Sequence, residues 1–572
     1  MRCRPAGALE CARFPLAPNV TLTPPEGRTP MTEFRRLAPF IAVALAIAPV
    51  PALAGPGSLA PGAARADFVQ SSAAGDRLRA LPAPGVAPGR APERITLRVD
   101  LDRPRQEMLG IGSALTEASA YVLAQLVKEA RDSVLAGLFG PTGADYTMTR
   151  THVGACDFTV RGNWSYDDVP GDTALAHFSL AHDAQGFADA RDTTYSLQSL
   201  LRDALARQPG LRIVASPWTA PAWMKDNGRF YVQGQGGGHL EVQYRETFAR
   251  YMAKYVAASA AAGVPIWAVT PENEPLGVGG QWESMEMSAD ELREYIAYHL
   301  GPALAPMGVK ILQYDQNRGD DAVRYSRAAL GDAACARQVW GTAVHWYDTT
   351  NSASTPTLDA IHDLAPDKPV VHTEGCVDAL GAKTNSPGGR FLGWKNDAWW
   401  WSPGATDWGW DWAPPADKPR HPRYVPVHRY ARDMIDGMNH WLAGWIDWNA
   451  VLDSRGLPNH VDNRCAAPLM VDPSSGEVYV TPVFDTMAHF SRYIRPGDHV
   501  LASRLSAPGL AADDFHALAV LDSSRDHLVV VALHTSASPL AWAIEAGRRH
   551  VSLTIPANAI QTLRLETRQL RD

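Results

Sequence analysis

The sequence predicts an α/β fold, a (β/α)8 TIM barrel joined to a β-sandwich. Two observations predict the barrel: strand and helix signals alternate over residues 108–464, and about eight short apolar strands fall in that span. A third observation predicts the sandwich, because residues 465–572 contain short β-rich runs separated by Ser, Gly, Pro and Asp. A strand expected within residues 93–107, with apolar residues at every second position, belongs to the sandwich too. The sandwich is therefore expected to be discontinuous.

The expected strands follow one another in a regular order along the chain. Helices are expected between most barrel strands, most clearly over residues 118–138 and 244–261. Barrel strands are expected near residues 108–117, 146–158, 211–216, 267–275, 309–314, 338–347, 370–374 and 444–449, and sandwich strands at 516–521, 527–533, 550–555 and 561–565.

The first part of the chain is expected to be processed or unstructured. Residues 1–54 have the pattern of an upstream extension followed by a signal peptide, because a charged region precedes an apolar run and small residues precede Gly55. The apolar run is shorter than the about 20 residues of a membrane-spanning helix. We therefore expect export to the periplasm or the outside, with no integral membrane span after cleavage. Residues 55–92, rich in Ala, Pro and Gly, are expected to be a flexible linker.

Composition excludes several classes of function. The chain has 572 residues, of which 46% are hydrophobic and 20% charged, with a net charge of −8 and no basic stripe. Nucleic acid and anionic membrane surfaces are therefore not expected partners. The six cysteines match no metal motif, and the four beyond residue 54 are expected to be buried thiols rather than a disulfide scaffold. No cluster of His, Asp and Glu has metal-ligand spacing, so neither a metal nor a cofactor is expected.

Two glutamates stand at the ends of two expected barrel strands. Glu274 follows an apolar strand in the run Trp267–Pro275, and Pro275 is expected to keep Glu274 out of the helical region and extended. Glu374 closes a second short apolar strand. Catalytic residues of such barrels lie at the carboxyl ends of the strands, and two carboxyl groups there indicate glycoside hydrolysis. The alternative is that each glutamate is a solvated loop charge or a helix cap.

Seven motifs in order carry a resemblance to a known family. The chain resembles glycoside hydrolase family 30, of the acid β-glucosidase (glucosylceramidase) type, from about residue 95 to 570. The resemblance implies a retaining mechanism in which Glu274 is the acid/base and Glu374 the nucleophile. The motifs are Gly110-Ile-Gly-Ser-Ala-Leu-Thr-Glu117, Thr149-Arg-Thr-His-Val-Gly-Ala-Cys-Asp-Phe158, Ala215-Ser-Pro-Trp-Thr-Ala-Pro-Ala-Trp-Met224, Trp267-Ala-Val-Thr-Pro-Glu-Asn-Glu-Pro275, Ala343-Val-His-Trp-Tyr347, His372-Thr-Glu-Gly-Cys376 and Gly444-Trp-Ile-Asp-Trp-Asn449.

The same resemblance assigns polar groups around the two glutamates. Asn273 would bond the 2-hydroxyl of the sugar. Arg150 would reach towards Glu374 and keep it ionised, although a salt bridge without catalytic effect is an alternative. Glu117 stands where relatives have an aspartate that bonds the outer hydroxyls of the sugar. The glutamate side chain is longer by one methylene group, so the resemblance does not fix which sugar the site binds.

Aromatic residues at motif positions would form the walls of the sugar site. Trp218, Tyr347 and Trp445 are expected there because aromatic faces pack against the apolar faces of pyranose rings. Asn459 matches a loop position near the family's sugar site. For each tryptophan the alternative is ordinary core packing.

A tryptophan-rich segment departs from the family pattern. It follows the Glu374 strand and is expected to overhang the mouth of the barrel as glycan subsites or a lipid rim, or else to pack on itself. Its tryptophans are residues 394, 399, 400, 401, 408, 410 and 412.

The sequence therefore predicts a retaining glycosidase that acts on β-glucosides, with glucosylceramide-like substrates first. An endo-β-1,6-glucanase or a β-xylosidase of the same family is the alternative. A non-catalytic carbohydrate-binding protein is the alternative from another class. In each case the partner is a carbohydrate or glycolipid.

Overall fold

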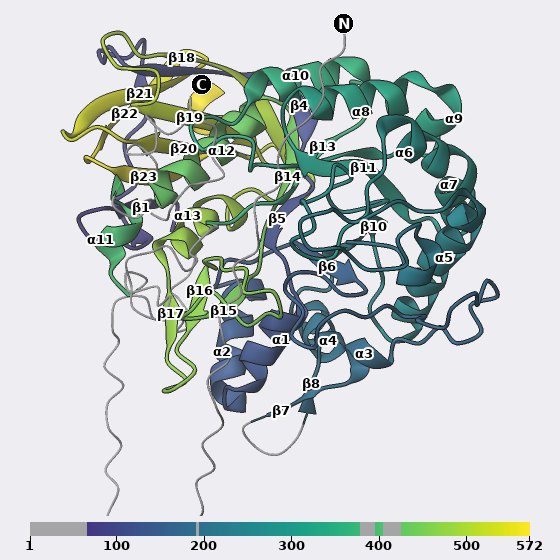
Figure 1. The fold of residues 1–572 in the computed structure, drawn as a ribbon. Coiled ribbons are helices and arrows are strands. Elements are labelled where there is room, and N and C mark those ends of the chain that lie inside the picture. Colours follow the sequence, from purple (N-terminus) through teal and green to yellow (C-terminus); the bar gives the residue numbers. More distant parts are fainter. Residues whose placement is uncertain (1–65, 190–193, 378–394, 404–424, 572) are drawn as a thin grey trace, which may run out of the picture. The chain divides into compact units, whose positions relative to one another are not determined.

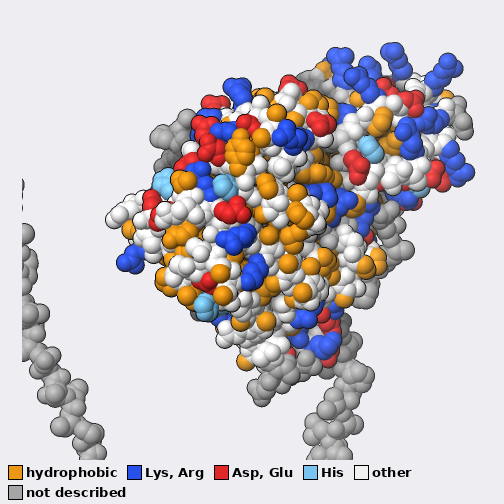
Figure 2. Space-filling view, turned by 90° about the vertical axis from the view of Figure 1, so that its right-hand side faces the viewer, with side chains coloured by type: hydrophobic (Ala, Val, Ile, Leu, Met, Phe, Trp, Pro, Cys, Tyr) orange, Lys and Arg blue, Asp and Glu red, His pale blue; other side chains and the backbone are white. Residues whose placement is uncertain are grey.

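A computed structural model describes residues 66–189, 194–377, 395–403 and 425–571 (Figure 1). The expected extension and signal peptide, and the first residues of the expected linker, lie outside the described residues. Within the described ranges, no helix combines the length and the apolar character needed to cross a membrane. On the face shown in Figure 2, positive and negative side chains are interspersed.

Eight parallel strands close into a barrel, which confirms the predicted fold class. The strands pair in chain order around the ring, and β14 returns to β5. They are β5 (Gly110–Ser113), β6 (Met148–Val153), β9 (Arg212–Pro217), β10 (Ala268–Val269), β11 (Lys310–Asn317), β12 (Gly341–His345), β13 (Val370–Glu374) and β14 (Leu442–Asp447). All eight were expected near these positions.

Helices lie outside the barrel strands (Figure 1). The helix expected over residues 118–138 is two helices, because the chain turns at Gln125–Val127. The Thr116 hydroxyl caps the first of them by accepting the Ser119 N–H at 3.3 Å. The helices are α1 (Glu117–Ala124), α2 (Lys128–Phe139), α3 (Ala181–Ala184), α4 (Leu197–Arg207), α5 (Arg245–Ala261), α6 (Ala289–Tyr295), α7 (Gly301–Leu304), α8 (Asp320–Gly331), α9 (Ala333–Ala336), α10 (Thr355–Leu364), α11 (Asp397–Trp400), α12 (Pro426–Asn439), α13 (Pro482–Ser491) and α14 (Thr567–Arg571).

The second domain is a sheet with the strand order β2-β1-β23-β20-β19-β18-β4-β21-β22-β3. Its pairs are antiparallel except for β21 with β4. Apolar side chains from both ends of this order, among them Leu97, Val530, Trp542 and Val551, share one core, as expected for a sandwich. The strands are β1 (Phe68–Ser72), β2 (Arg79–Ala80), β3 (Ala87–Pro88), β4 (Thr96–Glu107), β18 (His499–Ser506), β19 (Phe515–Leu521), β20 (His527–His534), β21 (Leu540–Ala546), β22 (Arg549–Ile555) and β23 (Ala559–Glu566).

The flexible linker expected over residues 55–92 is wrong for its described part. Strand β1 is buried along its whole length and pairs with β23, and β2 and β3 extend the two edges of the sheet. The run Phe68-Val-Gln-Ser-Ser72 is too short to show a clear period of two, and the surrounding Ala, Pro and Gly hide it. The N-terminal contribution to the sandwich therefore begins before residue 93.

The sandwich also resumes later than the expected boundary at residue 465. Strands β16 (Leu469–Val471) and β17 (Val478–Val480) form a small sheet with β15 (Val451–Asp453), which follows the last barrel strand. Helix α13 then packs against α12 and β5. These segments extend the barrel domain up to about β18. The boundary was expected too early because a β-rich composition alone does not distinguish an accessory sheet of the barrel from a sandwich.

Helix α12 joins the two domains. It packs against β14 on the barrel side and against β19 and β20 on the sandwich side. At its end the Asn439 amide donates to the carbonyl of Ala517 at 3.0 Å. The sandwich is thus fixed to the outside of the barrel next to strands β14 and β5, the second through α13, which also contacts β1 and β23.

Candidate active site

The two predicted carboxylates meet at the carboxyl ends of the barrel strands. Glu374 is the last residue of β13, and Glu274 follows β10 by five residues. Carboxylate oxygens of Glu274 and Glu374 and a ring nitrogen of His345 all lie within 4.8 Å of one another. Only 8% of Glu274 and 7% of Glu374 are exposed. The pair is therefore close and shielded from solvent.

Glu274 does not have the extended backbone expected of a residue before proline. Its φ is +54°, in the left-handed region of backbone conformations that residues other than glycine rarely adopt. Hydrogen bonds hold it there: the Glu274 N–H donates to the carbonyl of Asp315 at 3.0 Å, and the Asn273 N–H donates to that of Pro217 at 2.7 Å. Backbone strain of this kind occurs where a catalytic side chain must be aimed.

Glu374 accepts hydrogen bonds at both oxygens. Arg150 Nη1 donates to Oε2 at 2.5 Å, and the Tyr347 hydroxyl donates to Oε1 at 3.1 Å. Burial raises the pKa of Glu374 and Glu274 adds to this, whereas His345 and Arg150 oppose it. The net direction is upward, so Glu374 ionises at a higher pH than an ordinary glutamate.

Arg150 connects four groups of the site. Its fully buried guanidinium donates to Glu374, to Asn273 Oδ1 and Asp315 Oδ2 at 2.7 Å each, and to Ser216 Oγ at 3.0 Å. Burial lowers the pKa of Arg150, but Asp315 and Glu374 raise it by more than burial lowers it. The net direction is upward, so the guanidinium stays charged. The predicted contact of Arg150 with Glu374 is present, and Asn273 lies beside it, while the bond of Asn273 to a sugar 2-hydroxyl stays a prediction.

Asp315 is a central residue that sequence reasoning missed. It lies in β11 at a bulge, where Tyr314 and Asp315 have φ values of +77° and +67°. The bulge turns the Asp315 carboxylate inward, where it accepts hydrogen bonds from the hydroxyls of Thr270 at 2.7 Å and Thr373 at 2.6 Å. Burial raises its pKa, but Arg150 and His345 outweigh burial and hold the pKa well below the ordinary value. The sequence did contain a signal for this residue, because Asp315 is a polar residue directly after the strand expected near residues 309–314.

His345 joins Asp315 to Glu274. Its Nε2 lies 3.1 Å from Asp315 Oδ1 and its Nδ1 lies 3.3 Å from Glu274 Oε1. Burial lowers the pKa of His345, but the charge of Glu374 and the hydrogen bonds with Asp315 and Glu274 raise it to about 9. At neutral pH the ring is therefore an imidazolium that donates to both carboxyl groups.

The cluster of Glu274, His345 and Glu374 also has donor atoms close enough to share a cation. The oxygens of Glu374 already accept from Arg150 and Tyr347, and two buried positive charges oppose a third. The arrangement is suited to a pair of carboxyl groups of which one gives a proton and the other attacks.

Trp218 and Tyr347 lie next to Arg150 and Glu374, where a sugar wall is predicted, whereas Trp445 does not. The Trp445 ring stacks on His372 with centroids 3.6 Å apart and meets Trp346 edge to face at 5.6 Å, on the α12 side of the barrel. Its strand directs it outward, a distinction that the motif does not show. Trp445 is therefore a core residue.

Trp448, just beyond the end of β14, takes the place expected of Trp445. Its ring stacks on Trp218 with centroids 5.3 Å apart and planes at 27°. The Arg150 guanidinium lies 4.8 Å from the Trp218 ring and 5.7 Å from the Trp448 ring. These contacts connect the aromatic pair directly to the group that holds Glu374.

Glu117 and Asn459 use their polar atoms to hold loops. Glu117 Oε1 accepts the N–H groups of Val160 and Arg161 at 3.1 Å each, and burial raises the pKa of the carboxyl. Asn459 Oδ1 accepts the N–H groups of Val461 at 3.2 Å and Asn463 at 3.1 Å. Glu117 Oε1 and Asn459 Oδ1 thus fix neighbouring loops, and the predicted contacts of the two residues with a sugar stay predictions.

Asp157 is a buried polar group whose pKa responds to the carboxylate pair. Burial, followed by the charge of Glu374, raises its pKa well above the ordinary value. The Asn463 amide donates to Asp157 Oδ2 at 2.8 Å, while Oδ1 is buried and has no hydrogen-bond partner among the described residues. The motif that ends at Phe158 contains this residue, but no role was predicted for it.

The tryptophan-rich segment is described only over residues 395–403. There Trp400 is fully buried, 7% of Trp401 is exposed, and Trp399 packs against the same core. Helix α11 is anchored by Asp397, which accepts a hydrogen bond from Arg77 at 2.8 Å. These three tryptophans pack inward, and the other four of the segment lie outside the described residues.

Solved structures share this fold over most of the chain. SrfJ from Salmonella typhimurium superposes with a TM-score of 0.71 at 24% identity, covering 87% of this chain and 99% of that one. An endo-β1,6-glucanase superposes with a TM-score of 0.68 at 22% identity, covering 87% and 98%. At these identities the likeness shows the fold.

Sequence relatives and a family model define the family. The chain is 30% identical over 399 residues to "Putative glucosylceramidase 4" of Caenorhabditis elegans (68% of each chain) and 28% identical over 442 residues to "Lysosomal acid glucosylceramidase" of Mus musculus (76% of this chain, 77% of the relative). It is 27% identical over 407 residues to "Endo-1,6-beta-D-glucanase" of Neurospora crassa, covering 70% and 72%. The model for the glycosyl hydrolase family 30 TIM-barrel domain matches residues 108–393 and 419–494. The chain therefore belongs to glycosyl hydrolase family 30 and is a glycosidase.

Proposed function

We propose that this chain is a retaining β-glucosidase that works by double displacement through Glu274 and Glu374. The distance within 4.8 Å between carboxylate oxygens of the two residues carries the proposal. Retaining enzymes hold their two carboxyl groups about 5–5.5 Å apart, whereas inverting enzymes need about 6.5–9.5 Å to admit a water between them.

Glu374 is the nucleophile in this proposal. Arg150 and Tyr347 both donate to it, and those hydrogen bonds favour the ionised form that attacks the anomeric carbon. As Glu374 attacks, it forms a bond to the anomeric carbon, and the electron pair of the glycosidic bond leaves on the aglycone oxygen. That oxygen takes the proton of Glu274, so the negative charge is on Glu274 once the covalent glycosyl-enzyme has formed. Asn273, held by Arg150, is placed beside the pair to bond the 2-hydroxyl.

Glu274 is the acid/base. It gives its proton to the leaving oxygen in the first step and removes one from water in the second. The His345 imidazolium, 3.3 Å from Glu274 Oε1, stabilises the carboxylate that forms after the first transfer. Asp315 balances that imidazolium and keeps the His345 ring in place.

For the substrate we propose a β-glucoside, with a glucosylceramide-like glycolipid first. Support comes from relatives named glucosylceramidases, which match this chain at 26–30% identity. Relatives named endo-1,6-β-D-glucanases, at 27% and 24% identity, support a β-1,6-glucan as the second candidate. We further propose that residues 1–54 direct the chain out of the cytoplasm before it meets either substrate.

A four-substrate panel tests the proposal. The substrates are an aryl β-glucoside, an aryl β-xyloside, glucosylceramide in detergent and a β-1,6-glucan, with Glu374→Gln as the control. We expect the wild type to hydrolyse the aryl glucoside with retention, as seen by NMR of the first-formed anomer, and Glu374→Gln to lose at least about a thousandfold in kcat. Product of inverted configuration, or a Glu374→Gln variant of normal activity, would refute the assignment.

The panel also separates the candidates for the natural substrate. Cleavage of glucosylceramide points to the glycolipid, and cleavage of the polymer alone points to the endo-glucanase. Xyloside cleavage points to the β-xylosidase alternative. Sugar binding without turnover of any substrate would favour a carbohydrate-binding protein instead.

A further inference from the structure

A cavity lies at the amino ends of the barrel strands, opposite to the carboxylate pair. Its volume is about 490 Å³, within the about 300–1,000 Å³ of small-molecule sites. Because the barrel strands are parallel, the residues that begin or directly precede them gather at one end of the barrel. Those that line the cavity include Arg212, Trp267, Lys310, Trp340, Lys368 and Trp441, and Arg105 of β4 lies beside them.

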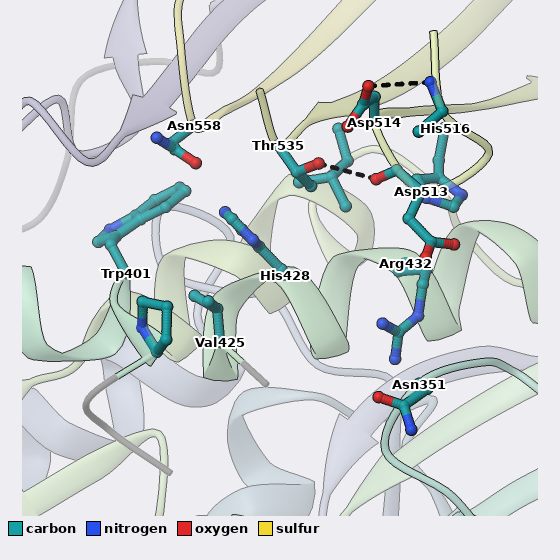
Figure 3. A pocket seen from close by; sticks show the side chains of 13 residues that line it. Asn351, Trp401, Val425, His428, Arg432, Asp513, Asp514, His516, Thr535 and Asn558 are labelled. Carbon is teal, nitrogen blue, oxygen red and sulfur yellow. Dashed lines mark hydrogen bonds between the residues drawn. The ribbon is translucent and has the colours of Figure 1, made fainter. Parts of the chain in front are cut away.

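A larger cavity, of about 730 Å³, lies between helix α12 and the sandwich (Figure 3). Its lining includes Pro403 and Val425, which flank residues outside the described ranges, and Trp401 beside it is only 7% exposed. The cavity at the strand ends is lined by partly exposed charged side chains instead, so its chemistry follows from its walls.

The charges on this cavity are mostly positive. Two carboxylates, Glu107 and Asp367, also line it, so a net positive charge of about two remains in a chain whose net charge is −8. Its cations are partly exposed, and none of them forms a salt bridge within the described part of the chain; they are Arg105, Arg212, Lys310 and Lys368.

The two arginines show that nearby carboxylates do not balance this charge. Burial lowers the pKa of Arg105, and the charge of Asp359 only partly opposes this, since Asp359 pairs with His440 at 2.9 Å. Burial also lowers the pKa of Arg212, against the charge of Glu107. In both cases the surroundings stabilise the guanidinium less than burial destabilises it. An anion in the cavity would supply the missing negative charge.

Tryptophan rings position two of the cations. The guanidinium carbon of Arg105 lies 3.9 Å from the centroid of the Trp441 ring. Lys310 Nζ lies 5.4 Å from the ring centroids of both Trp267 and Trp340. These two rings meet edge to face at 5.1 Å and pack against a core cluster of barrel residues. The rings are thus fixed by packing, and they hold the charged groups beside the cavity.

Hydrogen bonds to the backbone use only part of the donors. Arg105 Nη1 donates to the carbonyl of Asn439 and Arg212 Nη1 to that of Leu109, at 2.6 Å each. A guanidinium has five N–H groups, so both arginines keep donors for a ligand. The Lys310 ammonium forms no hydrogen bond with any described residue.

We propose that this cavity binds a phosphate monoester, with the phosphate held by the cations and a compact organic group beside Trp267 and Trp340. Guanidinium and ammonium groups are common partners of phosphate in proteins. A monoester carries about two negative charges at neutral pH, which matches the net charge of the lining. The cavity has room for more than one phosphate group, and its partly exposed indole rings suit an apolar or ring-shaped body. The site lies at the other end of the barrel from the carboxylates, so it does not depend on the proposed function.

The test changes Lys310, because its ammonium can be removed without removing a hydrogen bond among the described residues. Lys310→Met keeps an unbranched chain beside the rings and removes the charge, whereas Lys310→Arg keeps the charge. Lys128→Met removes the same charge from an exposed position on α2, outside the cavity, and is the matched control. Lys368→Met removes another charge of the cavity and takes the place of Lys310→Met if thermal unfolding shows that Lys310→Met is not folded.

Binding of phenyl phosphate is measured by calorimetry at neutral pH and constant ionic strength, with inorganic phosphate and phenol for comparison. We expect the wild type, Lys310→Arg and Lys128→Met to bind one equivalent of phenyl phosphate. Lys310→Met should bind it at least about tenfold more weakly, a loss of about 1.4 kcal/mol. Hydrolysis of the aryl glucoside should proceed at the wild-type rate in all of these variants.

The comparison ligands identify what the cavity recognises. Tighter binding of phenyl phosphate than of inorganic phosphate supports a monoester, and phenol should not bind. If the wild type binds neither phosphate, or Lys310→Met binds phenyl phosphate like Lys128→Met, the site is refuted and the cations serve only the backbone carbonyls and the rings. Equal binding of phenol and phenyl phosphate would refute it too. A chain without glycosidase activity would refute the proposed function and leave this binding result unchanged.

Discussion

Replacing Tyr347 by phenylalanine is a sharp test of how the site sets the charge of the nucleophile. The change removes one oxygen, the hydroxyl that donates to Glu374 Oε1 at 3.1 Å, and leaves the ring in place. A hydrogen bond to a charged group contributes about 1.5–3 kcal/mol, and one pKa unit corresponds to about 1.4 kcal/mol. Loss of the bond therefore raises the pKa of the Glu374 carboxyl by about 1–2 units.

The sign of the effect on activity follows from the role of Glu374. In the proposed mechanism the residue attacks as the carboxylate, so activity falls as the pH drops through its pKa, which burial already places above that of an ordinary glutamate. We expect the acidic limb of kcat/KM for an aryl β-glucoside to move about 1–2 units to higher pH in Tyr347→Phe. This limb belongs to the coupled carboxyl pair, and both residues contribute to it.

A matched control is available in Tyr295. It is fully buried, and its hydroxyl has no hydrogen-bond partner among the described residues, so Tyr295→Phe removes the same atom without removing a bond. We expect Tyr295→Phe to keep the wild-type pH profile. Thermal unfolding of both variants shows that each is folded. An acidic limb that stays in place in Tyr347→Phe, or moves to lower pH, would refute the reasoning.

Four further changes have defined outcomes. Glu274→Ala should slow substrates with poor leaving groups by at least about a hundredfold and spare those with good ones, and azide should restore turnover as a glycosyl azide of retained configuration; no azide product would contradict the acid/base role. The fold raises the pKa of His345 to about 9, so its protonated ring stabilises the folded state fully below about pH 6.5 and loses this effect as the pH rises through 9. The free energy of unfolding in urea should therefore be lower at pH 10 than at pH 6 by on the order of 3 kcal/mol, and His345→Gln should lack this difference. Asp157→Asn should lower kcat/KM by about ten- to a hundredfold at unchanged melting temperature, and an unchanged kcat/KM would show that its buried oxygen meets no substrate. Trp448→Phe should raise KM, whereas Trp445→Phe should lower the free energy of unfolding by about 1–3 kcal/mol and leave KM unchanged. The reverse pattern would show that Trp445, and not Trp448, contacts the sugar.

The sequence was sufficient to predict the barrel because most of its strands are buried and apolar and are followed by a polar residue or a breaker. The two glutamates proposed as catalytic were predicted for the same reason, because each ends or follows such a strand. Arg150 and Tyr347 were found through the motifs, and the structure brings both onto Glu374.

The residues that were missed depend on features that a linear pattern does not contain. Asp315 points inward because a bulge shifts the register within β11. Trp445 and Trp448 stand three residues apart in one motif, and only the end of the strand decides which ring meets Trp218. Strand β1 was hidden because its partner β23 lies at the other end of the sequence.

That last pairing has a consequence for how the chain is made. Phe68 lies opposite Leu563, and β4 pairs with β18 and β21, so the first strands to leave the ribosome have partners that are translated last. At about 5–20 residues per second, β1 waits roughly 25–100 s for β23. A strand edge left open for that time is prone to pair with another chain. We therefore expect β23 to pair with β1 late in biosynthesis, when the barrel has already formed, and this pairing to complete the sandwich.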